Sequence, residues 1–188
     1  MFPIRIIIDL CLFRARPQDL PVSTALVWVT AAVWAAIGTA AAQLGDASLT
    51  ARETVDEATS LLRNVADIAS HIVLYAGVIW AALNLAGKRE RFRQTATAQF
   101  GINAVFGLIM LPVTPALVEL MRKGRDAQFG WEAYFAIAVG LWSFVVMARI
   151  MQEAFEVTAG KAAMITIACV LLPYVPLFLL VALTSSGA

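Results

Sequence analysis

Five long apolar stretches divide this chain, and each is long enough to cross a lipid bilayer as a helix. They cover residues 23–44, 66–87, 95–121, 131–151 and 162–183. An α-helix rises about 1.5 Å per residue, so about 20 apolar residues cross the roughly 30 Å hydrocarbon core of a membrane. The sequence therefore predicts an all-α fold, in which five transmembrane helices pack as a polytopic bundle.

The segments between these stretches are short, which bounds what the chain can carry outside a membrane. Hydrophobic residues make up 61 % of the 188 residues and charged residues 14 %. The longest polar connection, 45–65, is too short for a separate catalytic domain, so we expect one membrane domain over 1–188. The net charge of +1 gives no overall attraction to nucleic acid.

The N-terminal residues 1–16 combine an apolar run with charges and do not resemble a signal peptide. The run 6–13 is interrupted by Asp9 and followed by Arg14 and Arg16, where a signal peptide would have small residues at a cleavage site. We expect an amphipathic segment on the membrane surface; a loosely ordered tail is the alternative. The side chains predicted to face lipid are Ile6, Ile7, Leu10, Cys11 and Phe13.

Positive residues near the ends of the five spans predict the orientation of the chain, because cytoplasmic loops are enriched in Lys and Arg. With a cytoplasmic N-terminus, the inner side carries Arg5, Arg14, Arg16, Lys88, Arg89, Arg91, Arg93, Arg149 and Lys161. The outer side carries Arg52, Arg63, Arg122, Lys123 and Arg125. The inner side holds more of the cations, which favours a cytoplasmic N-terminus and a periplasmic C-terminus.

The cations of 121–125 oppose this orientation, and a second topology would remove the conflict. Pro112 and Pro115 interrupt the third apolar stretch, and proline kinks or breaks a helix. The segments 95–121 and 131–151 would then form a re-entrant pair that returns 121–125 to the cytoplasmic side. A simple kink within a full span is the commoner outcome.

Small residues recur every four positions in the first span. Ala32, Ala36 and Ala40 form one such row, and Gly38 and Ala42 form another. Small residues at this spacing let helix backbones approach closely, so we expect this span to lie inside the bundle.

Few residues within the spans offer chemistry. His71, Asn84 and Asn103 are predicted to make polar contacts between helices, and lining of a transport path is the alternative for the two asparagines. Neither a metal-ligand spacing nor a nucleotide-binding motif occurs, so we expect no cofactor, no metal and no catalytic residues.

The basic loop between the second and third spans is the best candidate for a functional surface. Four cations fall within six residues: Lys88, Arg89, Arg91 and Arg93. At the cytoplasmic face they are expected to contact anionic lipid headgroups or a partner protein. The alternative is that they serve only to fix the topology of the chain.

The order of these elements resembles the YIP family of small five-span membrane proteins. The match lies at Asp19, Leu20 and Pro21, just before the first span. A weaker match is the pairing of Tyr174 and Pro176 late in the chain. The resemblance implies five closely packed helices, a cytoplasmic N-terminus and a role linked, in eukaryotes, with membrane trafficking. The family's longer N-terminal region and a glycine between Leu and Pro are missing, which puts partner binding through that region in doubt. The Arg-rich loops are typical of a bacterial inner-membrane protein.

Taken together, the sequence favours a non-catalytic membrane protein that acts as a scaffold or organiser through lipid or protein contacts. An accessory subunit of a larger membrane complex, such as a respiratory or secretion assembly, is the first alternative, and a homo-oligomer is also possible. A small transporter is a further alternative, because the proline pairs at 112/115 and 173/176 would allow helices to bend around a central site.

Overall fold

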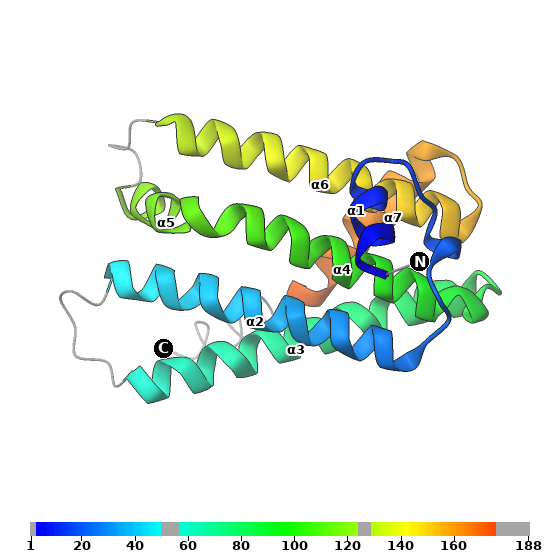
Figure 1. Ribbon diagram of the computed structural model, residues 1–188, viewed down its shortest axis with the longest axis horizontal. Coiled ribbons are helices and arrows are strands. Elements are labelled where there is room, and N and C mark those ends of the chain that lie inside the picture. Colours follow the sequence, from blue (N-terminus) through cyan, green and yellow to red (C-terminus); the bar gives the residue numbers. More distant parts are fainter. Residues whose placement is uncertain (1–2, 50–56, 124–128, 176–188) are drawn as a thin grey trace, which may run out of the picture.

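The computed structural model describes residues 3–49, 57–123 and 129–175, and within these ranges the chain is helical and contains no strand (Figure 1). The α-helices are α1 (Pro3–Cys11), α2 (Thr24–Leu49), α3 (Glu57–Leu85), α4 (Phe92–Met110), α5 (Thr114–Lys123), α6 (Trp131–Phe155) and α7 (Ala159–Leu171). Short 3-10 turns are η1 (Pro17–Asp19), η3 (Arg89–Arg91), η4 (Leu111–Val113) and η6 (Leu172–Tyr174).

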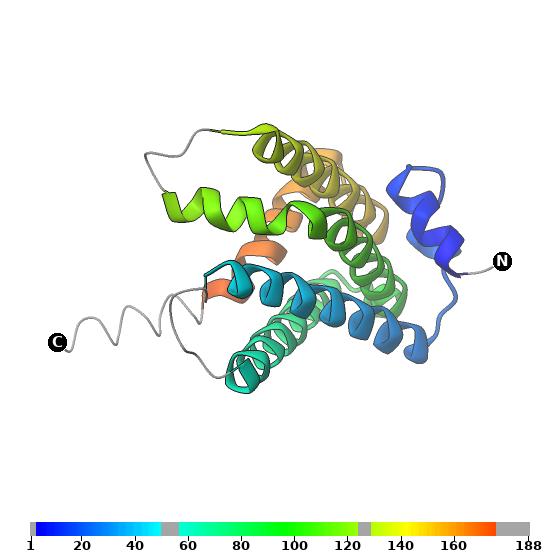
Figure 2. The same ribbon diagram turned by 60° about the vertical axis from the view of Figure 1, so that its left-hand side comes forward.

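Four of the helical segments are long and apolar enough to cross a membrane. They are Thr24–Gly45, Leu61–Leu85, Arg89–Lys123 and Trp131–Phe155. Successive segments run in opposite directions along the bundle (Figures 1 and 2). The fifth predicted span is described only as a shorter apolar helix, Ala159–Tyr174, because its second half lies outside the described residues. The all-α fold is confirmed, and the number of spans shown is four.

The third segment bends at η4, so that α5 runs at a clear angle to α4 (Figures 1 and 2). Pro112 lies in η4, where the backbone tightens, and Pro115 lies in the first turn of α5, where a proline needs no helical donor. The Thr114 hydroxyl donates to the Met110 carbonyl at 3.1 Å and so satisfies one group near the kink. α5 ends at the opposite end of the bundle from η3, and α6 starts there (Figures 1 and 2). The segment therefore reaches from one end of the bundle to the other, as a kinked full span would, and the re-entrant pair remains an untested alternative.

α4 forms the centre of the molecule, because small residues let its neighbours approach. Ala96, Ala98 and Ala104 are almost fully buried, and every residue from 95 to 102 is buried. One apolar cluster joins α4 to α2, α3, α6 and α7, and a second joins it to α1 and α6 on another face.

The N-terminal helix α1 is amphipathic, but its apolar face is buried in the protein instead of facing lipid. Ile6, Ile7, Leu10 and Cys11 are at most 8 % exposed and pack on α4 and α6. Gly101 makes this possible, since a Cβ added there would lie 2.7 Å from Ile7 Cδ1. The prediction of lipid contact is wrong for these four side chains, because α4 offers a groove that accepts them.

The two rows of small residues in α2 face different surroundings. Gly38 packs on Ile68 of α3, as expected of a close helix contact. Ala32, Ala36 and Ala40 are exposed, beside Trp28, which is 69 % exposed. The span packs in the bundle against α3, α4 and α5, as expected, but it does so through the side that carries Gly38 and not through the alanine row.

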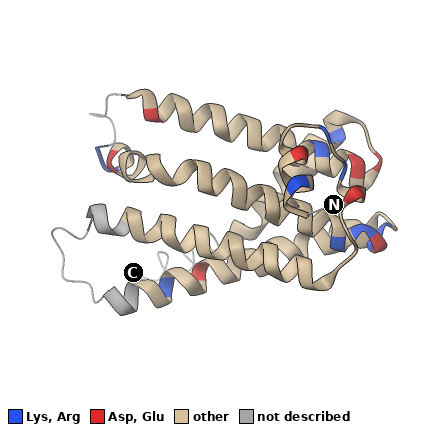
Figure 3. Cartoon of the chain, in the orientation of Figure 1, with Lys and Arg blue, Asp and Glu red and all other residues tan. Residues whose placement is uncertain are grey.

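Charged side chains gather toward the two ends of the bundle, and long apolar lengths of helix separate them (Figure 3). α1, η1, η3 and the connection between α6 and α7 share one end, which we call the basic end. This separation matches a chain whose apolar middle lies in hydrocarbon while both ends reach water.

Candidate functional site at the basic end

The basic loop and the connection from α6 to α7 meet at the basic end. Lys88 Nζ donates to Glu156 Oε2, and Arg91 Nη2 donates to Glu156 Oε1 at 2.5 Å. These contacts place 87–94 and 152–161 on the same side of the bundle, as the predicted topology requires.

Glu156 is held by backbone geometry as well as by the two cations. It ends α6 with a left-handed backbone (φ +55°), which turns the chain toward α7 and places the carboxylate beside the basic loop. Hydrogen bonds from Lys88 and then Arg91 lower the pKa of Glu156 to about 2. The carboxylate is therefore ionised over the whole physiological pH range.

Arg91 also caps the end of α6. Its Nη1 donates to the carbonyl oxygens of Glu153 and Ala154, at 3.1 and 3.2 Å. The last carbonyls of a helix lack partners within the helix, and a guanidinium supplies donors in a fixed fork. We call the group of Lys88, Arg91 and Glu156 the clamp, because it joins the α3–α4 connection to the α6–α7 connection.

The segment before α2 is tied to the same end. Gln94 Nε2 donates to the carbonyl oxygens of Gln18 and Leu20, at 3.0 and 2.9 Å. Asp19 Oδ2 accepts from the Arg16 backbone N–H at 2.7 Å, and the Leu20 side chain is only 2 % exposed. Gln18 and Leu20 therefore dock the chain against α4, while Asp19 caps the turn η1.

The other two cations of the loop, Arg89 and Arg93, lie outside the clamp. Both are exposed, and neither forms an ion pair with a carboxylate in the described part of the chain. Arg89 Cζ lies 5.7 Å from the centroid of the Trp80 ring, a cation–π geometry. The four cations thus divide into a structural pair and a pair without an acidic partner.

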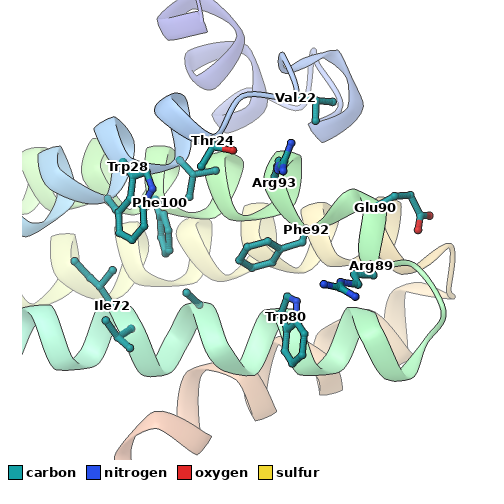
Figure 4. Close-up of a pocket in the computed structure, with 14 residues that line it drawn as sticks. Val22, Thr24, Trp28, Ile72, Trp80, Arg89, Glu90, Phe92, Arg93 and Phe100 are labelled. Carbon is teal, nitrogen blue, oxygen red and sulfur yellow. The ribbon is translucent and has the colours of Figure 1, made fainter.

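Arg89 and Arg93 stand at the mouth of an apolar groove between α2, α3 and the start of α4 (Figure 4). The groove has a volume of about 910 Å³. Its side chains include buried Ile72 and Phe100 and the exposed indole rings of Trp28 and Trp80. Such a volume is within the range of about 300–1,000 Å³ found for small-molecule sites.

The start of α2 adds a further positive element beside this mouth. Val22 and Thr24 line the groove, and α2 begins at Thr24. The Ser23 hydroxyl accepts from the Leu26 N–H at 3.3 Å, which satisfies one of the first N–H groups of the helix. The positive end of the helix dipole therefore faces the same region as the two arginines.

His71 lies away from the basic end, among aromatic rings from three elements. Its ring centroid is 5.9 Å from that of Trp34 on α2 and 5.0 Å from that of Tyr174 in η6. Tyr75, one turn further along α3, extends the same stack toward Phe100. The structure thus places His71 at a contact between helices that consists of rings.

The two asparagines are not brought together. Asn103 is partly buried and interacts with the Tyr75 hydroxyl, whereas Asn84 is exposed near the end of α3.

The central polar contact of the bundle involves Gln99, which the sequence reasoning missed. Tyr75 Oη donates to Gln99 Oε1 at 3.1 Å, and Gln99 Nε2 donates to the Met147 carbonyl at 3.4 Å.

Comparisons with family models, with curated proteins and with solved structures gave no match for this chain. Over the described residues, no three His, Cys, Asp or Glu side chains are grouped in a way that could hold a metal ion.

Proposed function

We propose that this chain is a non-catalytic integral membrane protein that organises lipid and protein neighbours through its basic end. The observation that carries this proposal is the division of the basic loop. Two cations hold the helix connections together, and Arg89 and Arg93 remain available to anionic groups outside the protein. A loop that served only to fix the topology would need positive charge, but two of its cations would not need to remain without an acidic partner.

The position of these cations supports a role at the membrane surface. Arg89 and Arg93 follow the apolar segment Leu61–Leu85 directly and begin the segment Arg89–Lys123. Cations at such a boundary lie at the depth of lipid headgroups, where each contributes about 1 kcal/mol of attraction to an anionic leaflet. On this proposal the basic end is cytoplasmic, in a bacterial inner membrane, and the C-terminus is periplasmic.

The lipid composition around the protein tests this proposal. The protein is extracted together with its surrounding lipid in polymer nanodiscs, and the lipid classes are quantified by mass spectrometry. We expect anionic phospholipids to be enriched over the bulk membrane. A shell with the same composition as the bulk membrane would refute the proposal.

A second candidate is an accessory subunit of a larger membrane complex, which the far end of α6 favours. Trp131 and Tyr134 are 66 % and 67 % exposed, and the Trp131 ring lies 6.2 Å from that of Phe135. Exposed aromatic side chains are typical both of membrane interfaces and of contacts between proteins. Extraction in a mild detergent followed by native mass measurement distinguishes the candidates, since a lone monomer or homodimer contradicts the subunit role.

The kinship with the YIP family is likewise a proposal. It is supported by the docking of Asp19 and Leu20 before the first span and by the packed helical bundle. It implies a role in the organisation of membranes, in agreement with the function proposed above.

A further inference from the structure

We propose that the groove between α2 and α3 is a site for one anionic phospholipid, whose phosphate group binds Arg89 and Arg93 and whose acyl chain lies along the apolar wall. This inference deepens the proposed function and depends on it, because it assigns the contact with lipid to one site. On this inference one lipid molecule occupies a defined site, in addition to any general layer of anionic lipid around the protein.

The charges at the mouth of the groove fit a phosphate group. The guanidinium of arginine presents several N–H donors in a plane and binds phosphate oxygens in a bidentate manner. Arg89 and Arg93 both line the groove and have no carboxylate partner among the described residues, so their charge is not neutralised within that part of the protein. The start of α2 at Thr24 adds a positive helix end on the same side.

The one acidic residue at the groove does not oppose this arrangement. Glu90 lies between the two arginines in sequence, and Figure 4 shows its carboxylate directed away from the groove, while the Arg89 side chain reaches toward Trp80. The net charge at the mouth is therefore positive.

The wall of the groove fits a hydrocarbon chain. Besides the arginines, the lining includes Trp80, Ala76, Val73 and Ile72 on α3 and Trp28 on α2. Figure 4 shows Ile72 and Trp80 on one side of the groove and Trp28 on the other. Trp80 lies near the end of α3, and Arg89 begins η3 after the connection; the indole ring supports the guanidinium through the 5.7 Å cation–π contact. A tryptophan at the boundary and an apolar wall beyond it follow the order of a phospholipid, with the headgroup outside and the chain inside.

The combination of charge and apolar wall favours a lipid over a second copy of the chain. A second copy would place its own apolar helix in the groove and would have to supply an acidic group opposite Arg89 and Arg93. Among the described acidic side chains at the basic end, Asp9, Glu153 and Glu156 already form ion pairs, and Asp19 accepts from the Arg16 N–H. That leaves Glu90, which lies between the two arginines of its own chain. A phospholipid supplies the chain and the anion in one molecule.

Native mass spectrometry of the purified full chain, titrated with phosphatidylglycerol or with phosphatidylcholine of the same acyl chains, tests the site. We expect one phosphatidylglycerol to bind first and saturably. Phosphatidylcholine carries the same phosphate but also a quaternary ammonium, which cancels its net charge and is repelled by the arginines. It should therefore bind more weakly, by about fivefold for each arginine at the headgroup. In Arg89→Gln/Arg93→Gln the affinity for phosphatidylglycerol should fall about 30-fold, to near the affinity for phosphatidylcholine.

Matched variants separate the site from the general charge of the basic end. Arg14→Gln/Lys161→Gln removes two exposed cations that do not line the groove, and should keep the preference. Arg89→Lys/Arg93→Lys retains the charge and should keep most of it. Val73→Trp, at a lining position that is 67 % exposed, should weaken both lipids alike by filling the wall.

The outcomes distinguish the site from the wider function. If the control pair lost as much preference as the arginine pair, anionic lipid would be attracted without a site, and the inference would be wrong while the proposed function stood. A wild-type chain without any preference for phosphatidylglycerol would overturn both. A mass corresponding to a dimer that excludes lipid would assign the groove to a second copy and also overturn the inference.

Discussion

Arg91 joins the last turn of α6 to Glu156, donating from one nitrogen to the carboxylate and from the other to the carbonyls of Glu153 and Ala154. One side chain thus satisfies carbonyls at a helix end and pairs with the residue that turns the chain toward α7. The connection α3–α4 and the connection α6–α7 are held together by this contact.

The first prediction concerns this contact. Arg91→Lys keeps the charge but cannot reproduce the planar fork, so we expect a Tm lower by a few degrees, close to that of Arg91→Gln. The measurement is thermal unfolding in detergent, followed by circular dichroism. Lys161→Gln, an exposed cation near the start of α7, is the matched control and should leave the Tm unchanged. Full recovery of the Tm by Arg91→Lys would show that charge alone matters.

The pH dependence of the clamp follows from the lowered pKa of Glu156. A carboxyl whose pKa falls from 4.5 unfolded to about 2 folded stabilises the fold fully above pH 4.5, and this contribution is lost as pH falls toward 2. The difference in Tm between the wild type and Glu156→Gln should be constant from pH 5 to 8 and shrink below about 4.5. A difference that changed between pH 6 and 8 would contradict the assignment.

The docking of α1 predicts opposite effects of the same substitution at two glycines. Gly101→Ala puts a methyl group 2.7 Å from the Ile7 side chain and should loosen α1, whereas the Cβ position of Gly77 meets no atom within 4 Å. Gly77→Ala should therefore raise stability, since alanine favours a helix by about 0.5–1 kcal/mol over glycine. Limited trypsin cleavage near Arg14 reports on α1 and should accelerate only in Gly101→Ala. Equal cleavage of both variants would count against the docking of α1.

The polar contact at the centre of the bundle gives a further prediction. Tyr75→Phe removes the donor to Gln99 and should lower the free energy of unfolding by about 1 kcal/mol, in the range of hydrogen bonds between membrane helices. Adding Gln99→Leu removes the unpaired amide, so the double variant should lose less than the sum of the single variants. Unfolding in mixed micelles measures these differences. Additive losses would show that the two side chains are not coupled.

The sequence predicted the helical class and the approximate positions of four long apolar helices, because both depend on the length of apolar runs. It did not determine which side of a helix faces the protein. Ala32 and Gly38 both belong to rows of small residues, so the sequence indicates a close helix contact on either side of α2. The contact of Gly38 with Ile68 on α3 shows which side packs on that helix. The burial of Ile6 and Ile7 likewise depends on the space at Gly101, far along the chain.

The candidate site was predicted as a group of cations but not as two pairs. The spacing did not indicate this division, because Lys88 precedes the 3-10 turn Arg89–Arg91 and Arg93 lies in α4, so the four cations do not share one regular helix. The partner of the first pair could not be inferred, because Glu156 reaches it only through a left-handed backbone 65 residues beyond Arg91. The groove beside the second pair depends on the packing of α2 on α4.

The central claim is that the two pairs of cations have different roles, and the rise in Tm on adding phosphatidylglycerol tests it most directly. A ligand that binds the folded state raises the Tm. Lys88→Gln/Arg91→Gln should start from a clearly lower Tm and keep the rise. Arg89→Gln/Arg93→Gln loses only the exposed cation–π contact with Trp80, so it should start close to the wild-type Tm and lose the rise. Equal loss of the rise in both variants, or equal starting Tm values, would contradict the claim.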